Sequence, residues 1–345
     1  MTNNSRRDFL KKASLGATAL GLSGTAAASS AKTADIVPNR RELWIATLAQ
    51  YNIQGKDLDS CLRAALKQME NALPYSPHIF CLPEVFHWHG VTGTKPPMNV
   101  AAENGSGNII APFQQFAKTH RCYIICPIYT VENGNYYNAA VIIDSQGRRI
   151  GEYRKTRITT GECEKLVPGP REIPVFETPF GKIGVQICFD VEWPEGWRQL
   201  GEKGAEIVFW PSAFGGGKML NTYAWQNHYH VVTSTWKGTT KICDMTGSEI
   251  AGSGEYNRWG VCAPVNLEKA FLHSWPYNAR FPDIQKKYGR KVRISTLHEE
   301  EFTIIESLSD DVKVADILKE FDLKSHREHL KIAEQAQNKI LNKIP

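Results

Sequence analysis

Short apolar runs alternate with helical patterns of apolar residues from residue 43 onward, and this alternation restricts the fold more than any other feature. The runs at 43–52, 78–84 and 122–132 have the length and composition of strands. Between them, residues 58–73 and 109–121 place apolar side chains at helical spacing on one face. This part of the chain is therefore predicted to form a β-α-β-α-β unit of an α/β fold.

The middle of the chain changes to paired strands. Residues 138–155 contain two strand-like runs joined by Asp-Ser-Gln-Gly at 144–147, which is typical of a hairpin turn. A second hairpin is predicted to turn at 179–181, and helix and strand patterns then alternate again over 195–236. Two α/β halves that flank paired strands predict a four-layer α-β-β-α sandwich, in which helices cover two mixed sheets.

The first 31 residues follow a different pattern. They join the pair Arg6-Arg7 to a short apolar run that ends in small residues, which is typical of a twin-arginine (Tat) export signal. The run over 13–28 is shorter and less apolar than the about 18–20 residues of a membrane span. Residues 1–31 are therefore predicted to be a signal that is cleaved near Ala28 or Ala31.

This signal predicts the location and the charge of the mature chain. The protein is expected to use the Tat export machinery and to be periplasmic or extracellular, with no membrane span in the mature chain. The net charge of +5 falls to +2 without residues 1–31, which carry four basic residues and one acidic residue: Arg6, Arg7, Lys11, Lys12 and Asp8. A charge of this size indicates no nucleic-acid partner and no anionic membrane surface.

The eight cysteines are scattered and form no CxxC pair, so the sequence indicates neither a zinc site nor a dense disulfide framework. A bridge between Cys243 and Cys262 is left open. His87 and His89 are two residues apart, but no third metal ligand accompanies them. The sequence therefore predicts no metal site and mostly free thiols.

The chain from 271 to 345 is charge-rich and is predicted to be a largely helical C-terminal extension. Weak apolar stripes run through it at Ile317 and Phe321 and then at Leu330, Ala333 and Ile340. These stripes suit two interpretations, a solvated helical extension or a swapped arm that covers a partner subunit.

The segment from Gly181 to Trp197, GKIGVQICFDVEWPEGW, carries the first chemical signal. Apolar residues alternate along it up to position 187, which predicts a strand with one face in the core. Cys188 then stands at the carboxyl end of that strand, where α/β folds present their chemistry. A cysteine attacks an acyl carbon as a thiolate, so it needs a base or a cation beside it.

Two other predicted strands end in residues that suit these roles. The strand predicted at 78–84 ends in Glu84, whose carboxylate can take up the thiol proton and later return it. Lys155 ends the second strand of the first hairpin, and its ammonium would favour a thiolate and stabilise an oxyanion. Each residue alone is weak evidence, because a single polar residue at a strand end is usually solvated.

The segments CLPEVF, GEYRKTRI and GVQICFDVEWPE, in this order, resemble the three signature segments of the nitrilase superfamily of carbon-nitrogen hydrolases. The later GAEIVFWPSAF is also similar to that family, and the resemblance extends over about 43–259, within a predicted hydrolase domain of 43–270.

The resemblance implies a role for each site residue. Glu84 would be the general base and acid, Lys155 the cation that stabilises the tetrahedral intermediate, and Cys188 the nucleophile. A second glutamate of the family comes from GECEKLVPG, where Glu164 is favoured over Glu162. The backbone N–H of Phe189 would complete the oxyanion hole. The resemblance implies no metal or organic cofactor, and it implies a homodimer or larger assembly.

The residues after the cysteine bear on the substrate. Cys188-Phe189-Asp190 followed by Pro194-Glu195 resembles the amidase and carbamoylase branches, whereas nitrilases usually show Cys-Trp-Glu. The expected reaction is hydrolysis of a small amide or N-carbamoyl compound to an acid plus ammonia or an amine, through a cysteine thioester. The alternatives are nitrile hydrolysis, acyl transfer by the same triad, and an exported binding protein on an inactive scaffold.

One residue departs from the family pattern. Arg157 occupies a position two after the lysine that is often histidine in relatives, which affects leaving-group contacts or the preferred substrate charge. Several aromatic residues near the motif strands either line an apolar pocket or pack in the core: Trp88, Trp193, Trp197, Trp210 and Phe214.

Overall fold

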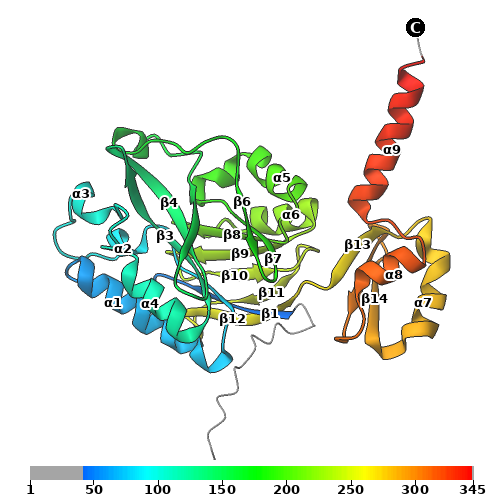
Figure 1. The fold of residues 1–345 in the computed structure, drawn as a ribbon, viewed down its shortest axis with the longest axis horizontal. Coiled ribbons are helices and arrows are strands. Elements are labelled where there is room, and N and C mark those ends of the chain that lie inside the picture. Colours follow the sequence, from blue (N-terminus) through cyan, green and yellow to red (C-terminus); the bar gives the residue numbers. More distant parts are fainter. Residues whose placement is uncertain (1–41, 344–345) are drawn as a thin grey trace, which may run out of the picture. The chain divides into compact units, whose positions relative to one another are not determined.

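The structure is a computed structural model, and it describes residues 42–343. The predicted export signal lies outside these residues. Two six-stranded sheets form the centre of the fold (Figure 1). The first sheet has the order β12-β1-β2-β3-β4-β5, and its strands are β1 (Glu42–Leu48), β2 (Ile79–Cys81), β3 (Tyr123–Glu132), β4 (Asn135–Ile143), β5 (Arg149–Arg154) and β12 (Gly260–Asn266).

The second sheet has the order β11-β10-β9-β8-β7-β6. Its strands are β6 (Val175–Thr178), β7 (Gly181–Val185), β8 (Ile207–Ser212), β9 (His230–Thr235), β10 (Lys241–Cys243) and β11 (Glu249–Gly252). In each sheet three neighbouring strands are parallel, β1-β2-β3 and β7-β8-β9, and the outer strands pair antiparallel. Both sheets are therefore mixed, as predicted.

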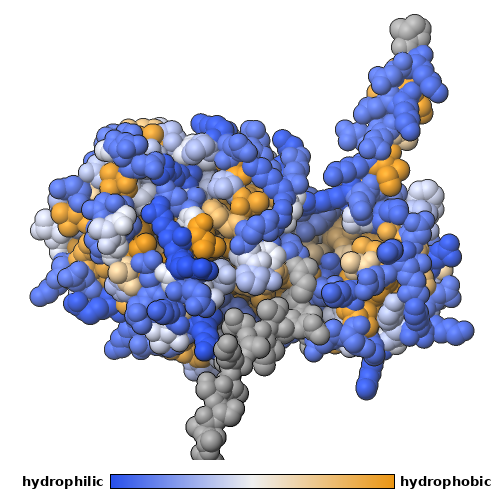
Figure 2. Space-filling view, viewed as in Figure 1, coloured by the Kyte–Doolittle hydropathy of each residue, from blue (hydrophilic) through white to orange (hydrophobic). Residues whose placement is uncertain are grey.

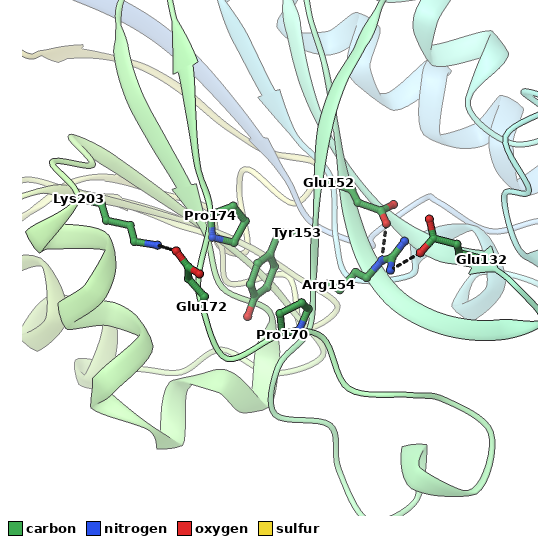
Figure 3. A pocket seen from close by; sticks show the side chains of 8 residues that line it. All are labelled: Glu132, Glu152, Tyr153, Arg154, Pro170, Glu172, Pro174 and Lys203. Atoms are coloured by element: carbon green, nitrogen blue, oxygen red, sulfur yellow. Dashed lines mark hydrogen bonds and ion pairs between the residues drawn. The ribbon is translucent and has the colours of Figure 1, made fainter.

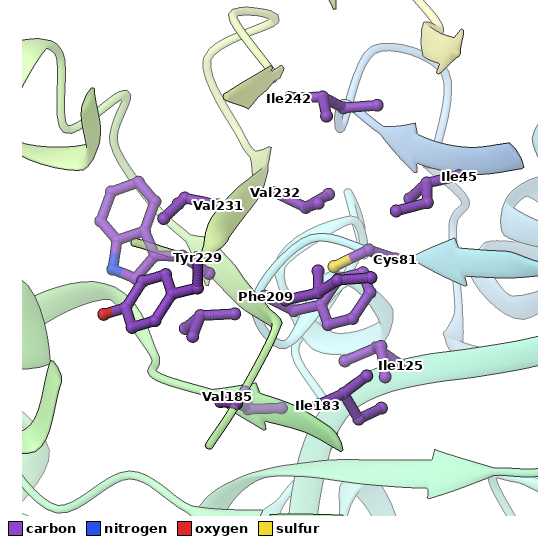
Figure 4. Close-up of a cluster of buried hydrophobic side chains, with 14 of the residues drawn as sticks. Ile45, Cys81, Ile125, Ile183, Val185, Phe209, Tyr229, Val231, Val232 and Ile242 are labelled. Carbon is purple, nitrogen blue, oxygen red and sulfur yellow. The ribbon is translucent and has the colours of Figure 1, made fainter. Parts of the chain in front are cut away.

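Side-chain alternation along the strands defines the layers. Ile45 of β1 belongs to the cluster between the two sheets, whereas its neighbour Ala46 belongs to the cluster under the helices. Figure 4 shows Cys81 and Ile125 of the first sheet in the same cluster as Ile183 and the other apolar residues of the second sheet. This shared core holds the sheets face to face.

Helices cover the outer faces of both sheets. Those on the first sheet are α1 (Leu58–Met69), followed by the 3-10 turn η1 (Glu70–Tyr75), and α2 (Phe86–His89), α3 (Met98–Ala101) and α4 (Ala111–His120). Those on the second sheet are α5 (Pro194–Glu202) and α6 (Lys218–Asn227). The predicted four-layer α-β-β-α sandwich is confirmed. Within residues 42–343, no helix has both the length and the apolar character that a membrane span requires.

The C-terminal region contains a sheet that the prediction of a largely helical extension omitted. Its three antiparallel strands have the order β13-β15-β14 and comprise β13 (Lys269–His273), β14 (Val292–Leu297) and β15 (Phe302–Ser307). The helical elements are η4 (Tyr277–Arg280), α7 (Phe281–Tyr288), η5 (Gly289–Lys291), α8 (Val314–Glu320) and α9 (His326–Leu341). The strand β14 is only six residues long and charge-rich residues flank it on both sides, which conceals its strand pattern in the sequence.

The helix α9 buries none of its side chains among the described residues. Ser325 caps its first turn by accepting a hydrogen bond from the N–H of Glu328. Leu330, Ile340 and Leu341 are exposed, and hydrophobic side chains are visible along this helix in Figure 2. The helix thus keeps the apolar stripe that suits either a solvated extension or a swapped arm.

The shared core predicts a strong dependence of stability on Ile45. Replacing this fully buried residue with alanine leaves a cavity between the sheets, and we expect Ile45→Ala to lower the free energy of unfolding by about 2–5 kcal/mol. The matched control is Ile150→Ala at a 38% exposed position of β5, with an expected change within about 0.5 kcal/mol. Urea denaturation measures both, and equal values for the two variants would contradict the assigned layers.

Candidate active site

Cys188 begins a tight turn directly after β7. It is the first residue of the 3-10 helix η3 (Cys188–Glu192), and its φ of 47° lies in the left-handed region. A residue with a Cβ enters this region at a cost of about 1–3 kcal/mol, so the surrounding structure must hold it there. Part of that support comes from Trp210, whose indole N–H donates to the carbonyl of Cys188 at 3.1 Å.

Asp190, two residues further on, connects this turn to the end of β5. Its carboxylate is buried and accepts four hydrogen bonds, from Tyr153 Oη (2.7 Å), Ile187 N (2.8 Å), Thr156 Oγ1 (3.0 Å) and Arg157 N (2.8 Å). One of these donors precedes the cysteine, and the other three surround Lys155 in the sequence. Asp190 therefore fixes the nucleophile turn relative to the lysine, a role that the sequence analysis did not assign.

The ammonium of Lys155 lies between two carboxylates. Its Nζ donates to Glu84 Oε1 at 2.9 Å and to both oxygens of Glu162 at 3.0 and 2.9 Å. The lysine is 1% exposed, so these contacts replace the water that the charge loses. The structure thus brings together Glu84 and Lys155, which are 71 residues apart in sequence.

Asn138 of β4 holds the same two carboxylates from a second direction. Its Nδ2 donates to Glu84 Oε1 and to Glu162 Oε1, both at 2.8 Å. Glu84 Oε1 is therefore engaged twice, whereas the buried Oε2 of Glu84 has no hydrogen-bond partner among the described residues. A buried carboxylate oxygen without a partner is costly, and it is the oxygen available to receive a proton.

Glu162, not Glu164, completes this cluster. The two residues begin and end the 3-10 helix η2 (Glu162–Glu164), in which successive side chains point about 120° apart. Thr159 donates its backbone N–H to Glu162 Oε2 at 2.8 Å and turns that carboxylate toward the lysine. Glu164 is exposed, so the preference for Glu164 is corrected in favour of the alternative, Glu162.

The charges of the cluster reinforce each other. Burial alone would lower the pKa of Lys155, but the negative charges of Glu84 and Glu162, and that of Cys188 whenever its sulfur is ionised, raise it well above its usual value. Burial would raise the pKa of the Glu162 carboxyl, yet Lys155 and the donors around it hold that pKa below its usual value. The lysine is therefore a permanent cation at neutral pH.

The thiol of Cys188 belongs to the same electrostatic group. Burial, and then the charge of Glu84, raise its pKa to about 12, while Lys155 opposes this increase. The backbone of Ala213 and the hydroxyl of Ser212, at the end of β8, also lower the pKa by hydrogen bonding to the sulfur. The resting sulfur is therefore a thiol, and it needs a base in order to react.

The aromatic residues divide between core and site. Trp197 and Trp210 are fully buried in the apolar core, where Trp197 of α5 stacks on Tyr223 of α6, so neither lines an open pocket. Phe214 packs edge-on against Trp210. Trp193 lies near Phe189, with ring centroids 5.1 Å apart, next to the predicted oxyanion donor. Trp88 lies in α2, the helical turn that follows Glu84, and packs with Tyr129.

The described residues hold no group of three metal-ligating side chains. His87 bonds to the carbonyl of Ala101 at 2.9 Å, whereas His89 stacks on Trp236, so the two histidines face different surroundings. Cys243 and Cys262 are both free thiols.

Charged residues line a separate hollow of about 520 Å³ (Figure 3). In it Arg154 pairs with both Glu132 and Glu152, and Lys203 pairs with Glu172 at 3.3 Å. Because these charges neutralise each other, we interpret this hollow as an ion-paired surface.

The fold and the Glu-Lys-Cys cluster define the class of protein, an α/β enzyme equipped for acyl transfer to sulfur. The family model "Carbon-nitrogen hydrolase" matches residues 45–270. The chain belongs to this family of carbon-nitrogen hydrolases.

Characterised relatives are similar over part of the chain. An N-carbamoylputrescine amidase of Arabidopsis thaliana is 30% identical over 214 residues, which are 51% of this chain and 72% of the relative. A citrullinase of Francisella tularensis is 32% identical over 207 residues, 50% of this chain and 72% of the relative.

Solved structures share the fold. Nit3 of Saccharomyces cerevisiae, a member of the nitrilase superfamily, has a TM-score of 0.56 at 20% identity and covers 66% of this chain and 90% of its own. An amidase of Nesterenkonia sp. has a TM-score of 0.56 at 19% identity and covers 67% and 91%. A variant of that amidase shows covalent addition of the acetamide moiety of fluoroacetamide at the active site cysteine.

The raised pKa of Cys188 predicts a steep pH dependence of its reactivity. With a pKa of about 12, the thiolate fraction grows about tenfold for each pH unit, and we expect labelling by methyl methanethiosulfonate to accelerate accordingly from pH 7 to pH 10. Peptide mapping by mass spectrometry separates the label on Cys188 from that on the exposed Cys163. A rate for Cys188 that levels off below pH 9 would show a thiolate already present at rest.

Proposed function

We propose that this protein hydrolyses a small amide or N-carbamoyl compound through a thioester on Cys188, with Glu84 as the acid and base. The observation that carries the proposal is the unpartnered Oε2 of Glu84, whose other oxygen is fixed by Lys155 and Asn138. A protonated thiol and a carboxylate with one free oxygen, in one buried electrostatic group, form a nucleophile and its base.

The first half of the reaction forms the thioester. The thiol proton passes to Glu84 Oε2 as the sulfur bonds to the carbonyl carbon, and the carbonyl oxygen becomes an oxyanion. The ammonium of Lys155 and the backbone N–H of Phe189 stabilise that charge, and a preorganised donor of this kind is worth about 3–4 kcal/mol. Glu84 then gives its proton to the leaving nitrogen, the carbon–nitrogen bond breaks, and ammonia or an amine departs.

The second half consumes water. Glu84, again a carboxylate, takes a proton from water while the oxygen bonds to the thioester carbon. The second tetrahedral intermediate collapses, the carbon–sulfur bond breaks, and the proton held by Glu84 returns to the sulfur. The acid leaves, and the resting thiol is restored. Glu162 bonds to Lys155 throughout and keeps its ammonium charged and directed.

The relatives support the substrate class. Two of them are named for N-carbamoyl or ureido compounds, N-carbamoylputrescine and citrulline, and a structural neighbour is an amidase. We propose the same class for this chain, a small molecule with a terminal carbamoyl or carboxamide group.

We further propose the setting of this activity. The twin-arginine pattern in residues 1–31 supports export by the Tat machinery to the periplasm or the extracellular space. We propose a hydrolase domain over 43–270 and a C-terminal extension over 271–345 that takes part in a homodimer or larger assembly. The exposed apolar residues of α9 support the swapped-arm interpretation of that extension.

The thioester can be trapped directly. We expect the intact mass of the protein to increase by the acyl group after a brief exposure to mixed small amides, with the adduct on Cys188. Ammonia release should fall by about 10³-fold or more in Cys188→Ala, because the nucleophile is gone. A Cys188→Ala variant that still releases ammonia at the original rate, measured with a coupled enzyme assay, would disprove the mechanism.

Glu162 and Glu164 provide a matched pair, since both are glutamates of one short helix. Glu162→Gln removes a charge that holds Lys155, and we expect kcat to fall by about 10- to 100-fold, as for loss of a charge-assisted hydrogen bond. Glu164→Gln should change kcat less than twofold, because that side chain is exposed. Steady-state kinetics decide the assignment, and the reverse order of effects would restore Glu164.

A further inference from the structure

A hollow of about 340 Å³ is lined by residues next in sequence to the proposed catalytic residues, and it carries two arginines. The residues that line it come from the segment after β5 and from the end of η3: Thr156, Arg157, Ile158, Cys163, Leu166, Pro168, Arg171 and Trp193. Nothing in the mechanism proposed above uses Arg157 or Arg171.

Two of the residues that line this hollow are sequence neighbours of the proposed catalytic residues. Thr156 is the neighbour of Lys155, and Cys163 is the neighbour of Glu162. Trp193 also lines the hollow, and its ring packs against Phe189, the residue after the nucleophile. Sequence neighbours of the cation and of the second glutamate, and a residue in contact with Phe189, thus line the hollow, which suits it to hold the distal end of a bound substrate.

The charged side chains that line the hollow are all positive. Two guanidinium groups line the hollow, and no carboxylate among residues 42–343 does so. Arg171 Nη1 donates to the carbonyl of Thr156 at 2.9 Å, which anchors one end of its guanidinium and leaves its other donors for a ligand.

Arg157 is held in place but not neutralised. Its guanidinium lies 4.9 Å from the centre of the Trp193 ring, and its backbone N–H is fixed by Asp190. The carboxylate of Glu195 approaches it only to 4.0 Å and is itself largely exposed, at 62%. A guanidinium on an aromatic face with one distant, solvated counter-ion is preorganised to bind another anion.

We infer that this hollow binds a carboxylate on the distal end of the substrate, so that the enzyme prefers ω-carbamoyl or ω-carboxamide carboxylic acids. The inference rests on the proposed function for the position of the scissile bond. Arg157 and Arg171 are the specificity-determining residues, because planar guanidinium groups match the two oxygens of a carboxylate.

The test compares probes that differ mainly in the charge of the distal group: 3-ureidopropionate (anionic), propylurea (neutral) and 3-aminopropylurea (cationic), with succinamate and butanamide as the amide pair. We expect kcat/KM to be highest for the anionic member of each set. Arg157→Gln should lower kcat/KM for the anionic probes by about 10- to 100-fold, through KM, and leave the neutral probes within about twofold.

Three variants sharpen the test. Arg171→Gln should reproduce the selective loss, and Glu195→Gln should act in the opposite direction, raising kcat/KM for the anionic probes by about two- to threefold by removing the competing carboxylate. The matched control is Arg198→Gln, an arginine of α5 that pairs with Glu202 and does not line the hollow, and it should change neither probe set.

Calorimetry on Cys188→Ala separates this inference from the proposed function. If the wild type hydrolyses none of the probes, the proposed function fails, and selective binding of 3-ureidopropionate or succinamate to Cys188→Ala still decides the inference. A preference for 3-aminopropylurea, equal losses for all probes in Arg157→Gln, or no binding of the anionic probes to Cys188→Ala would overturn it.

Discussion

The ion triad of Glu84, Lys155 and Glu162 is the interaction on which the site depends. A buried ammonium is tolerated only when carboxylates replace its water, and here two of them do so at hydrogen-bond distance. The same contacts occupy Oε1 of Glu84 and leave Oε2 free. One electrostatic requirement, the neutralisation of a buried lysine, thus also leaves one oxygen of Glu84 available for its proposed role as base.

This triad belongs to the first sheet, whereas the nucleophile belongs to the second, so the alignment of the site depends on hydrogen bonds that cross the sandwich. Asp190 joins the Cys188 turn to the end of β5. Trp236, after β9, donates its indole N–H to the carbonyl of Glu84 at 2.6 Å. Ser234 of β9 donates to carbonyls at the ends of β1 and β2 at 2.6 and 3.3 Å. A displacement of one sheet against the other would therefore separate the sulfur from its base.

The sequence predicted most of the sandwich because its central strands are long apolar runs bounded by helices with clear stripes. It did not assign β12, in which Pro264 interrupts the apolar pattern. That proline is tolerated because β12 is an edge strand, where one side of the backbone has no strand partner within residues 42–343. The strands β10 and β14 escaped prediction for local reasons: β10 has only three residues, and β14 is a short run between charge-rich segments.

For the site, the sequence predicted that Glu84, Lys155 and Cys188 stand at strand ends, and the structure places two of them in one ion pair with the third close enough to interact electrostatically. The choice of Glu164 failed because sequence spacing cannot show which residue of a 3-10 turn faces inward. Asn138 and Asp190 were missed for a different reason. Their importance lies in the contacts that each makes to segments distant in sequence, and their residue types are ordinary for a strand and a turn.

The catalytic cluster around Cys188 and the hollow with the two arginines carry different charges. We expect this difference to orient a substrate. The inner cluster holds two carboxylates and one ammonium around a neutral thiol, so it repels a second anionic group, while the outer hollow presents Arg157 and Arg171. A molecule with an amide at one end and a carboxylate at the other would be held with the carboxylate outward and the uncharged amide beside Cys188. Repulsion at the inner cluster and attraction at the outer hollow act on the same molecule, so the binding orientation follows from charge before any shape complementarity is considered.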